Sequence, residues 1–168
     1  IRTRRSIRKY INDSPILDTH MKALAEIAVL YPCPGNRQPL KVIATNNPRL
    51  CDTIFHTVRW AMYINGYEIP QEHRSVGYLI ILGDKTIANN FEFCAGALMM
   101  QLMLGAQALG LSTCCLGIAE KEDLINALEL DPERYSALYV LTLGYSDQKS
   151  SVIAMEQDFK YQLDGDGN

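Results

Sequence analysis

The chain has 168 residues, of which 48% are hydrophobic and 21% charged, and this length and composition predict a single folded domain over residues 1–168. A net charge of −3 argues against a general nucleic-acid binder, and no apolar run reaches the roughly 18 residues of a membrane span. Five cysteines make a poor disulfide framework, and three scattered histidines make a poor zinc site. We therefore expect a cytoplasmic protein with reduced thiols that binds neither nucleic acid nor membranes.

The first half of the chain contains two predicted helices with a strand between them. An apolar stripe predicts a helix over residues 18–30, which the following prolines end. A short apolar run predicts a strand over residues 41–45. Asn47 and Pro48 form a good N-cap and first helical residue, so we expect a second helix from there to about residue 62.

The second half contains two strongly apolar segments. Residues 77–82 predict a strand, and their uninterrupted apolar character is typical of the centre of a sheet. Residues 95–109 predict a helix that is apolar nearly all round, which indicates burial inside the protein. A strand over 111–116, a surface helix over 120–128 and a strand over 138–143 complete the order. Strands and helices alternate only partly, so the pattern leaves α+β and α/β open, with a central sheet covered by helices.

A cluster of basic residues opens the chain and includes Arg4, Arg5, Ser6 and Arg8. Guanidinium groups make bidentate, charge-assisted hydrogen bonds to phosphate, and a hydroxyl group can add another. Residues 4, 6 and 8 share one face of an extended segment, and residues 4 and 8 align in a helix. In either geometry, Arg4, Ser6 and Arg8 can converge on one anion. A solvated, flexible basic terminus is the alternative interpretation.

The loop over residues 32–39 is stiff and sharply bent, because it contains three prolines and a glycine. Asn36 and Gln38 carry amides that both donate and accept hydrogen bonds. A planar ring with imide and carbonyl edges, such as a flavin, requires groups of this kind. A purely structural connection between a helix and a strand is the alternative.

Residues 110–118 form the third candidate segment. Gly117 can bring the backbone close to a planar ligand, whereas an ordinary buried strand that ends in a turn is the alternative. Cys115 is a candidate nucleophile, because a cysteine thiol can attack a substrate. No histidine lies near it in the sequence, however, and an apolar setting keeps a thiol inert, so we expect no catalytic cysteine.

Together, these segments resemble the nitroreductase family of FMN-binding oxidoreductases. The motifs are R-R-S-I-R at residues 4–8, P-C-P-G-N-R-Q-P at 32–39, G-L-S-T-C-C-L-G at 110–117 and L-G-Y at 143–145. Each motif is weak by itself, but their order and spacing are specific, and the resemblance covers roughly residues 3–147.

The resemblance implies a fold and a reaction. The family fold is α+β, with a central, mostly antiparallel sheet wrapped by helices, in an intertwined homodimer with two FMN molecules at the interface. The implied activity is that of an NAD(P)H-dependent flavin oxidoreductase, which passes hydride from NADH or NADPH through FMN to a small-molecule oxidant of nitro, quinone or enoate type. Because the flavin carries the chemistry, no catalytic side chain is expected.

The resemblance also implies roles for individual residues. Arg4 and Ser6 match the contacts to the FMN phosphate, with Arg5 among the cofactor-binding residues. Arg8 matches a basic residue near the flavin pyrimidine, where a fixed cation stabilises the charge that reduction leaves around N1 and O2. The other implied contacts are Pro32, Cys33, Pro34 and Asn36, which reach the flavin of the partner subunit with Gln38 in support, and Cys115, Leu116 and Gly117, which lie beside the ring.

The chain departs from the family pattern at several positions. The serine of the proline-rich loop is Cys33, and the tryptophan that follows is Leu40. An acidic residue that is frequent before the buried helix is replaced near Cys94. These departures concern the fit of the substrate more than the binding of the flavin.

The C-terminal tail is another departure. Family chains continue past the last strand to a basic segment that crosses to the partner, whereas only Lys149 and Lys160 are present here. We expect the natural protein to continue beyond Asn168 with such a basic segment.

Other functions remain open at this stage. A flavin carrier without enzymatic activity and an interaction domain without a cofactor are the two alternatives outside the enzyme class. Within the family, branches that degrade flavin or remove halogens use extra lid residues. The segment 64–74 with Tyr63, Tyr67 and His73 is the candidate lid here, and an ordinary exposed loop is the alternative.

Overall fold

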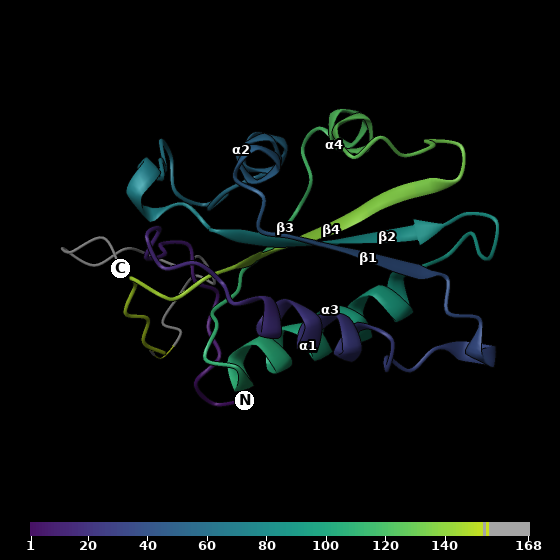
Figure 1. Cartoon of the computed structure of the whole chain (residues 1–168), viewed down its shortest axis with the longest axis horizontal. Coiled ribbons are helices and arrows are strands. Elements are labelled where there is room, and N and C mark those ends of the chain that lie inside the picture. Colours follow the sequence, from purple (N-terminus) through teal and green to yellow (C-terminus); the bar gives the residue numbers. More distant parts are fainter. Residues whose placement is uncertain (153, 155–168) are drawn as a thin grey trace.

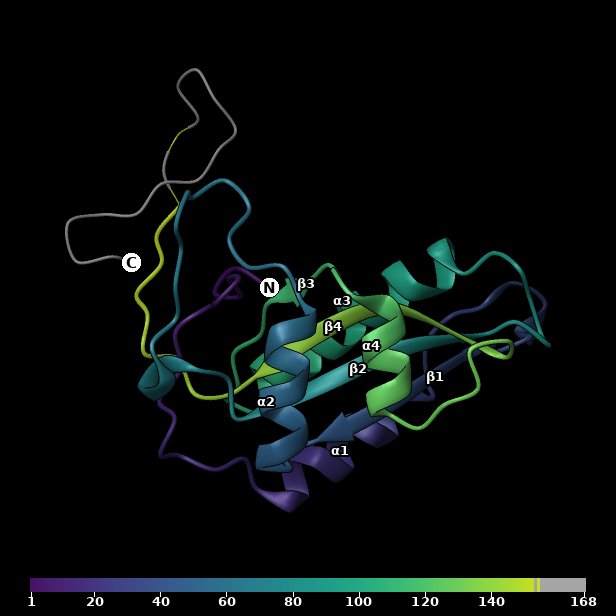
Figure 2. The same ribbon diagram turned by 90° about the horizontal axis from the view of Figure 1, so that it is seen from above.

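The computed structural model describes residues 1–152 and 154, which form three layers. The helices are α1 (Asp18–Ala28), α2 (Pro48–Thr57), α3 (Glu92–Ala108) and α4 (Lys121–Ala127). The strands are β1 (Leu40–Thr45), β2 (Gly77–Asp84), β3 (Cys115–Leu116) and β4 (Tyr135–Leu143). Short 3-10 helices lie at Pro34–Asn36 and Gln71–His73. An antiparallel sheet with the strand order β1-β2-β4-β3 forms the middle layer. Helices α1 and α3 cover one face of this sheet, and α2 and α4 cover the other (Figures 1 and 2). No helix within the described residues is long and apolar enough to cross a membrane.

Strand β2 lies at the centre of the sheet and contributes to both hydrophobic cores. All its residues are buried, and their side chains alternate between the two faces. Leu79 and Ile81 belong to the core beneath α1 and α3, whereas Tyr78, Ile80 and Leu82 belong to the core beneath α2 and α4. Because both faces of β2 are covered, its sequence is continuously apolar and lacks the alternation of a half-exposed strand.

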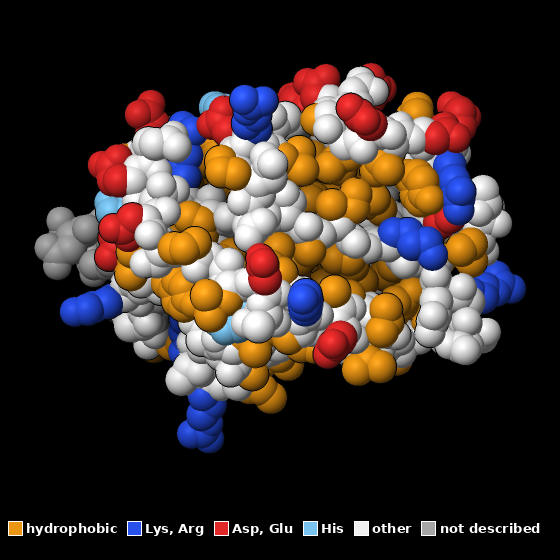
Figure 3. All heavy atoms as spheres, in the orientation of Figure 1, with side chains coloured by type: hydrophobic (Ala, Val, Ile, Leu, Met, Phe, Trp, Pro, Cys, Tyr) orange, Lys and Arg blue, Asp and Glu red, His pale blue; other side chains and the backbone are white. Residues whose placement is uncertain are grey.

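Helices α1 and α3 approach each other closely. A Cβ atom at Gly105 of α3 would lie 2.5 Å from Cδ1 of Ile27 in α1, so a larger residue there would require the Ile27 side chain to move. Helix α3 is nevertheless not enclosed, because Phe93 and Met100 are 67% and 46% exposed. Figure 3 shows further hydrophobic side chains gathered on the side of β1, between the two helical layers. The expectation that the all-apolar helix is buried on every side is therefore wrong for the isolated chain.

The structure confirms the α+β fold with an antiparallel central sheet and corrects two segment boundaries. Helix α2 ends at Thr57 rather than near residue 62, because Val58 leaves the helix and forms an isolated bridge with Ile118. Of the strand predicted over residues 111–116, only Cys115–Leu116 forms a ladder with β4. In both places a contact with a distant segment determines where the element ends.

A buried carboxylate lies at the end of β2. Asp84 is fully buried, and Nη2 and Nε of Arg134 donate to its Oδ2 at 2.9 and 3.2 Å. Thr86 donates to Oδ1 through its backbone N–H at 3.0 Å and its hydroxyl at 2.5 Å. The hydrogen bonds from Arg134 and Thr86 lower the pKa of Asp84 to about 2. The charged carboxylate therefore stabilises the turn that follows β2.

We expect Asp84→Asn to destabilise the protein in a pH-dependent way. The pKa of Asp84 is lower in the folded than in the unfolded chain, so its charge contributes stability that is fully present above about pH 4 and is lost as the pH falls toward about 2. In urea unfolding, the difference between wild type and D84N should be largest near neutral pH and shrink as the pH falls. The exposed Asp13→Asn variant should follow the wild type throughout, and a D84N difference independent of pH would contradict the prediction.

Candidate functional site

The N-terminal segment lies along the end of the sheet at which β4 ends. The Ile7 N–H donates to the Thr113 carbonyl at 3.0 Å, and Ser6 forms a parallel bridge with Thr113. Further along, the Ile11 N–H donates to the Tyr145 carbonyl at 2.9 Å. The basic cluster is therefore tied to the segment before β3 and the segment after β4, and it is not a free, solvated tail.

The side chain of Tyr10 anchors this segment in the core. Tyr10 is fully buried, and its hydroxyl donates to the Ile7 carbonyl at 2.6 Å and shares a hydrogen bond with Oγ1 of Thr142 in β4. Thr142 Oγ1 also accepts a hydrogen bond from the Cys114 N–H at 2.7 Å. Burial raises the pKa of Tyr10 well above its usual range, so the hydroxyl stays protonated at physiological pH.

Arg4, Ser6 and Arg8 meet around the buried thiol of Cys114. Burial raises the pKa of this thiol, whereas the charge of Arg8, a hydrogen bond with Ser6 and the charge of Arg4 act to lower it. All three side chains therefore act on one sulfur atom. Their convergence on one anion, which the sequence analysis expects, stays a prediction.

Two buried polar groups near this point have no hydrogen-bond partner within the described part of the chain. They are Oγ1 of Thr113, a residue that is 2% exposed, and Nε of Arg5. Nη1 of Arg5 donates to the Arg4 carbonyl at 2.6 Å, which holds this guanidinium against the backbone. Because buried polar groups normally have partners, the two groups suit a polar ligand or an ordered water.

The third predicted segment meets the N-terminal segment at Thr113 and then joins the edge of the sheet. Cys115 and Leu116 pair with Leu141 and Val140 of β4, and Gly117 follows on the surface. A Cβ atom at Gly117 would meet no described atom within 4 Å, so the space over this backbone is open. Burial raises the pKa of Cys115 to about 11, which keeps the thiol neutral and argues against a nucleophile.

The proline-rich loop between α1 and β1 lies at the opposite end of the sheet (Figure 1). Gly35, Asn36 and Gln38 have positive φ angles of 64°, 50° and 48°, which turn the backbone sharply. Nε2 of Gln38 donates to Oδ1 of Asn36 at 3.2 Å, so the two amides support each other. The amides and the flanking Pro32 and Pro34 are exposed, whereas Cys33 is half-buried. The loop thus presents polar groups to solvent, away from the arginines of its own chain.

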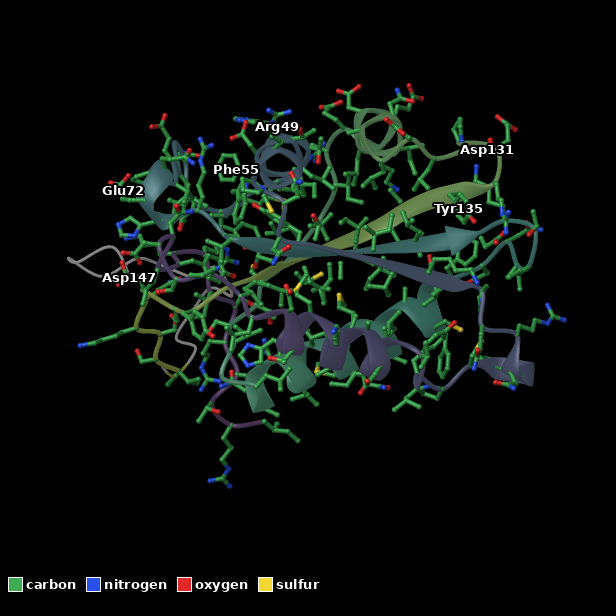
Figure 4. The ribbon with its side chains drawn as sticks, in the orientation of Figure 1. Arg49, Phe55, Glu72, Asp131, Tyr135 and Asp147 are labelled. Atoms are coloured by element: carbon green, nitrogen blue, oxygen red, sulfur yellow. The ribbon has the colours of Figure 1, made fainter. Side chains whose placement is uncertain are left out.

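The predicted site residues therefore form two groups separated by the length of the sheet. Strand β2 ends at Asp84, whose N–H donates to the carbonyl of Pro39 in the loop at 2.8 Å. An eight-residue strand such as β2 spans roughly 25 Å. Figure 4 shows Asp147, whose N–H donates to the Lys9 carbonyl, at one end of the molecule and Tyr135 at the other. One chain thus contains two half-sites. The N-terminal segment forms one half-site at one end of the sheet, and the proline-rich loop forms the other at the opposite end.

The candidate lid, residues 64–74, lies at the end that holds the N-terminal segment and is mostly exposed or half-buried. Nδ1 of His73 lies 3.1 Å from Oδ2 of Asp147, which fastens the end of this segment. A lid function stays a prediction. Of the two tail lysines, Lys149 is exposed and Lys160 lies outside the described residues.

The sequence analysis missed Tyr10 and Thr142, which hold the N-terminal segment in place. A signal was present for Thr142, because it is a polar residue within the strongly apolar segment 138–143. Such a residue requires a buried hydrogen-bond partner. Tyr10 follows the basic cluster directly, and its sequence context gives no sign that it is fully buried.

Both the sequence and the fold are similar to those of known proteins. The profile of the Nitroreductase family matches residues 1–145. A protein of Archaeoglobus fulgidus that carries the name of an NADH dehydrogenase or NAD(P)H nitroreductase is 27% identical over 158 residues, which cover 89% of this chain and 85% of the relative. The solved structure of an FMN-dependent nitroreductase from Clostridium difficile has a TM-score of 0.74 at 19% identity, covering 90% of this chain and 88% of that one. An FMN complex from Desulfovibrio desulfuricans has a TM-score of 0.73 at 25% identity, covering 93% and 89% of the two chains.

We expect Tyr10→Phe to loosen the N-terminal segment. Removal of this buried hydroxyl leaves the Ile7 carbonyl without this partner and removes one of the hydrogen bonds of Thr142, which should lower the free energy of unfolding by about 1–3 kcal/mol. Hydrogen exchange at the Ile7 and Ile11 amides should accelerate more than exchange in β2. Tyr139→Phe, on the same sheet but half-buried, is the matched control and should change neither measurement.

Proposed function

We propose that this chain, which belongs to the nitroreductase family, is an FMN-dependent oxidoreductase that acts as a homodimer. NADH or NADPH supplies the electrons, and a small organic acceptor of nitro, quinone or enoate type receives them. The named activity of the archaeal relative and the FMN in the Desulfovibrio structure support this proposal.

One observation carries the proposal: Arg4, Ser6 and Arg8 all act on the pKa of one thiol, that of Cys114, and two buried polar groups without a partner within the described residues belong to the same segments. The guanidinium group of Arg4 and the hydroxyl of Ser6 suit the phosphate of FMN, and the guanidinium group of Arg8 suits the pyrimidine edge of the flavin. The hydrogen bonds of Tyr10 hold these residues in place before any ligand binds, which lowers the entropy that binding costs. The open backbone at Gly117, which directly follows β3, suits a planar ring.

The separation of the two half-sites supports the homodimer. The amides of Asn36 and Gln38 lie too far from Arg4 and Arg8 to contact one flavin within a single chain. A second copy can bring its loop to the N-terminal segment of the first. The exposed apolar stripe of α3, which includes Phe93 and Met100, suits burial against such a copy, because an exposed apolar patch often marks an interface.

The residues of the chain have binding and electrostatic roles in this proposal. When bound, FMN would supply the redox chemistry, which is hydride transfer between the nicotinamide and the acceptor. Arg8 provides a fixed positive charge where reduction leaves negative charge, and it needs no proton transfer to do so. Asn36 and Gln38 donate and accept hydrogen bonds at the edge of the ring. Cys115, Leu116 and Gly117 line the ring through their backbone.

We expect the purified protein to bind FMN and to bleach its flavin absorption when NADH or NADPH is added without oxygen. Addition of a simple quinone or nitroaromatic compound should restore the absorption and give continuous NAD(P)H consumption. Flavin binding without consumption would favour the carrier, and failure to bind added FMN would favour an interaction domain without a cofactor.

We expect Arg4→Ala to weaken FMN binding by about 10- to 100-fold, because one charge-assisted contact to the phosphate is lost. Titration of the FMN-free protein by flavin fluorescence measures this affinity. Arg49→Ala is the matched control, since Arg49 lies exposed on α2, away from the N-terminal segment (Figure 4). Equal affinities of R4A and wild type would contradict the proposed phosphate site.

A further inference from the structure

Two cysteines from distant parts of the chain touch each other. Sγ of Cys33, in the proline-rich loop, lies 3.1 Å from Sγ of Cys94 in the first turn of α3. We propose that Cys33 and Cys94 form a reversible disulfide that fastens the loop to α3.

The surrounding backbone keeps the two sulfur atoms together. Cys33 lies between Pro32 and Pro34, whose rings restrict the loop, and Cys94 lies in a helix. A disulfide requires an S–S distance of about 2.05 Å, so the sulfurs must approach by only about 1 Å. Small side-chain rotations supply such a movement without a change of fold.

In the single chain, a cavity gives a small oxidant access to the pair. Cys33 and Cys94 line one cavity of about 370 Å³ together with Arg37 and Asn90, whose polar groups can hydrogen-bond a peroxide or water. Cys33 is half-buried, whereas Cys94 is 5% exposed, so an oxidant meets Cys33 first.

The oxidant in this proposal is hydrogen peroxide. The Cys33 thiolate attacks one peroxide oxygen, the O–O bond breaks, and the products are a sulfenic acid and hydroxide, which takes up a proton to form water. Cys94 then gives up its proton and attacks the sulfenic sulfur, the S–O bond breaks, and a second water leaves. The two thiols lose two electrons and peroxide gains two. A low-molecular-weight thiol reverses the reaction by disulfide exchange.

The other cysteines are not placed for this reaction. Cys114 and Cys115 are adjacent, but Cys114 packs in the core beneath α2 and α4, whereas Cys115 packs against the core beneath α1 and α3. Cys115 contacts the thioether of Met99 at 2.8 Å, which cannot form a disulfide. The thiol of Cys51 donates to the Val76 carbonyl. Only the Cys33–Cys94 pair therefore combines sulfur contact with access from a cavity within the described residues.

The test uses the full chain without added cofactor, so it does not depend on flavin binding. The reduced protein is treated with hydrogen peroxide, and its free thiols are alkylated, counted by intact mass and mapped by peptide analysis. We expect the wild type to lose two of its five thiols and about 2 Da of mass, with one peptide linking Cys33 to Cys94, and a small thiol should reverse the change. The unfolding midpoint of the oxidised protein should also lie about 5 °C or more above that of the reduced protein, because the link lowers the conformational entropy of the unfolded chain.

Three variants distinguish the pair from general oxidation. Cys33→Ser should form no intramolecular link, and Cys94→Ser should stop at the sulfenic acid on Cys33, seen as a gain of about 16 Da. Cys51→Ser should behave as the wild type. A wild type that keeps all five thiols, links another pair or joins two chains would overturn the inference. If a serine variant fails to fold, the peptide map of the wild type decides alone.

Discussion

The hydrogen bond between the buried side chains of Tyr10 and Thr142 joins the N-terminal segment to the last strand of the sheet. Together with the backbone hydrogen bonds of Ile7 and Ile11, it fixes the segment that carries the arginines of the first eight residues. The ring of Tyr10 also packs against the end of β4, since a Cβ atom at Gly144 would lie 2.7 Å from its Cδ1. The position of Arg4, Arg5 and Arg8 thus depends on the packing of Tyr10, an uncharged residue that is buried in the core.

The rigid sheet imposes a second constraint, because it keeps the loop of Asn36 and Gln38 far from the N-terminal segment. A packed sheet cannot bend to bring its two ends together. A site that needs both groups must therefore be assembled from two chains. This also gives a physical reason for a helix that is apolar nearly all round and yet only partly covered by its own chain. The apolar residues of α3 suit contact with the sheet on one side and with a second chain on the other.

Local signals in the sequence predicted much of the fold, and contacts between distant residues account for what they missed. The Asn47 side chain accepts hydrogen bonds from the N–H groups of Arg49 and Leu50, as a cap of α2 should. The end of α2 was misplaced because the bridge of Val58 with Ile118 joins residues sixty positions apart, which no local pattern records. Similarly, the motifs identified the arginines and the loop, but neither the separation of the two groups nor the contact of two thiols is visible in a linear sequence.

The N-terminal segment has a consequence for synthesis on the ribosome. Its hydrogen-bond partners are His73, the segment before β3 and the segment after β4, so residues 7–11 are held in place only after much of the chain that follows them has been made. The hydrogen bonds of Tyr10 and Ile7 reach His73 and Thr113, whereas those of Ile11 and Lys9 reach Tyr145 and Asp147. A nascent chain therefore gains these contacts one after another, and the last of them form only after β4 has been synthesised.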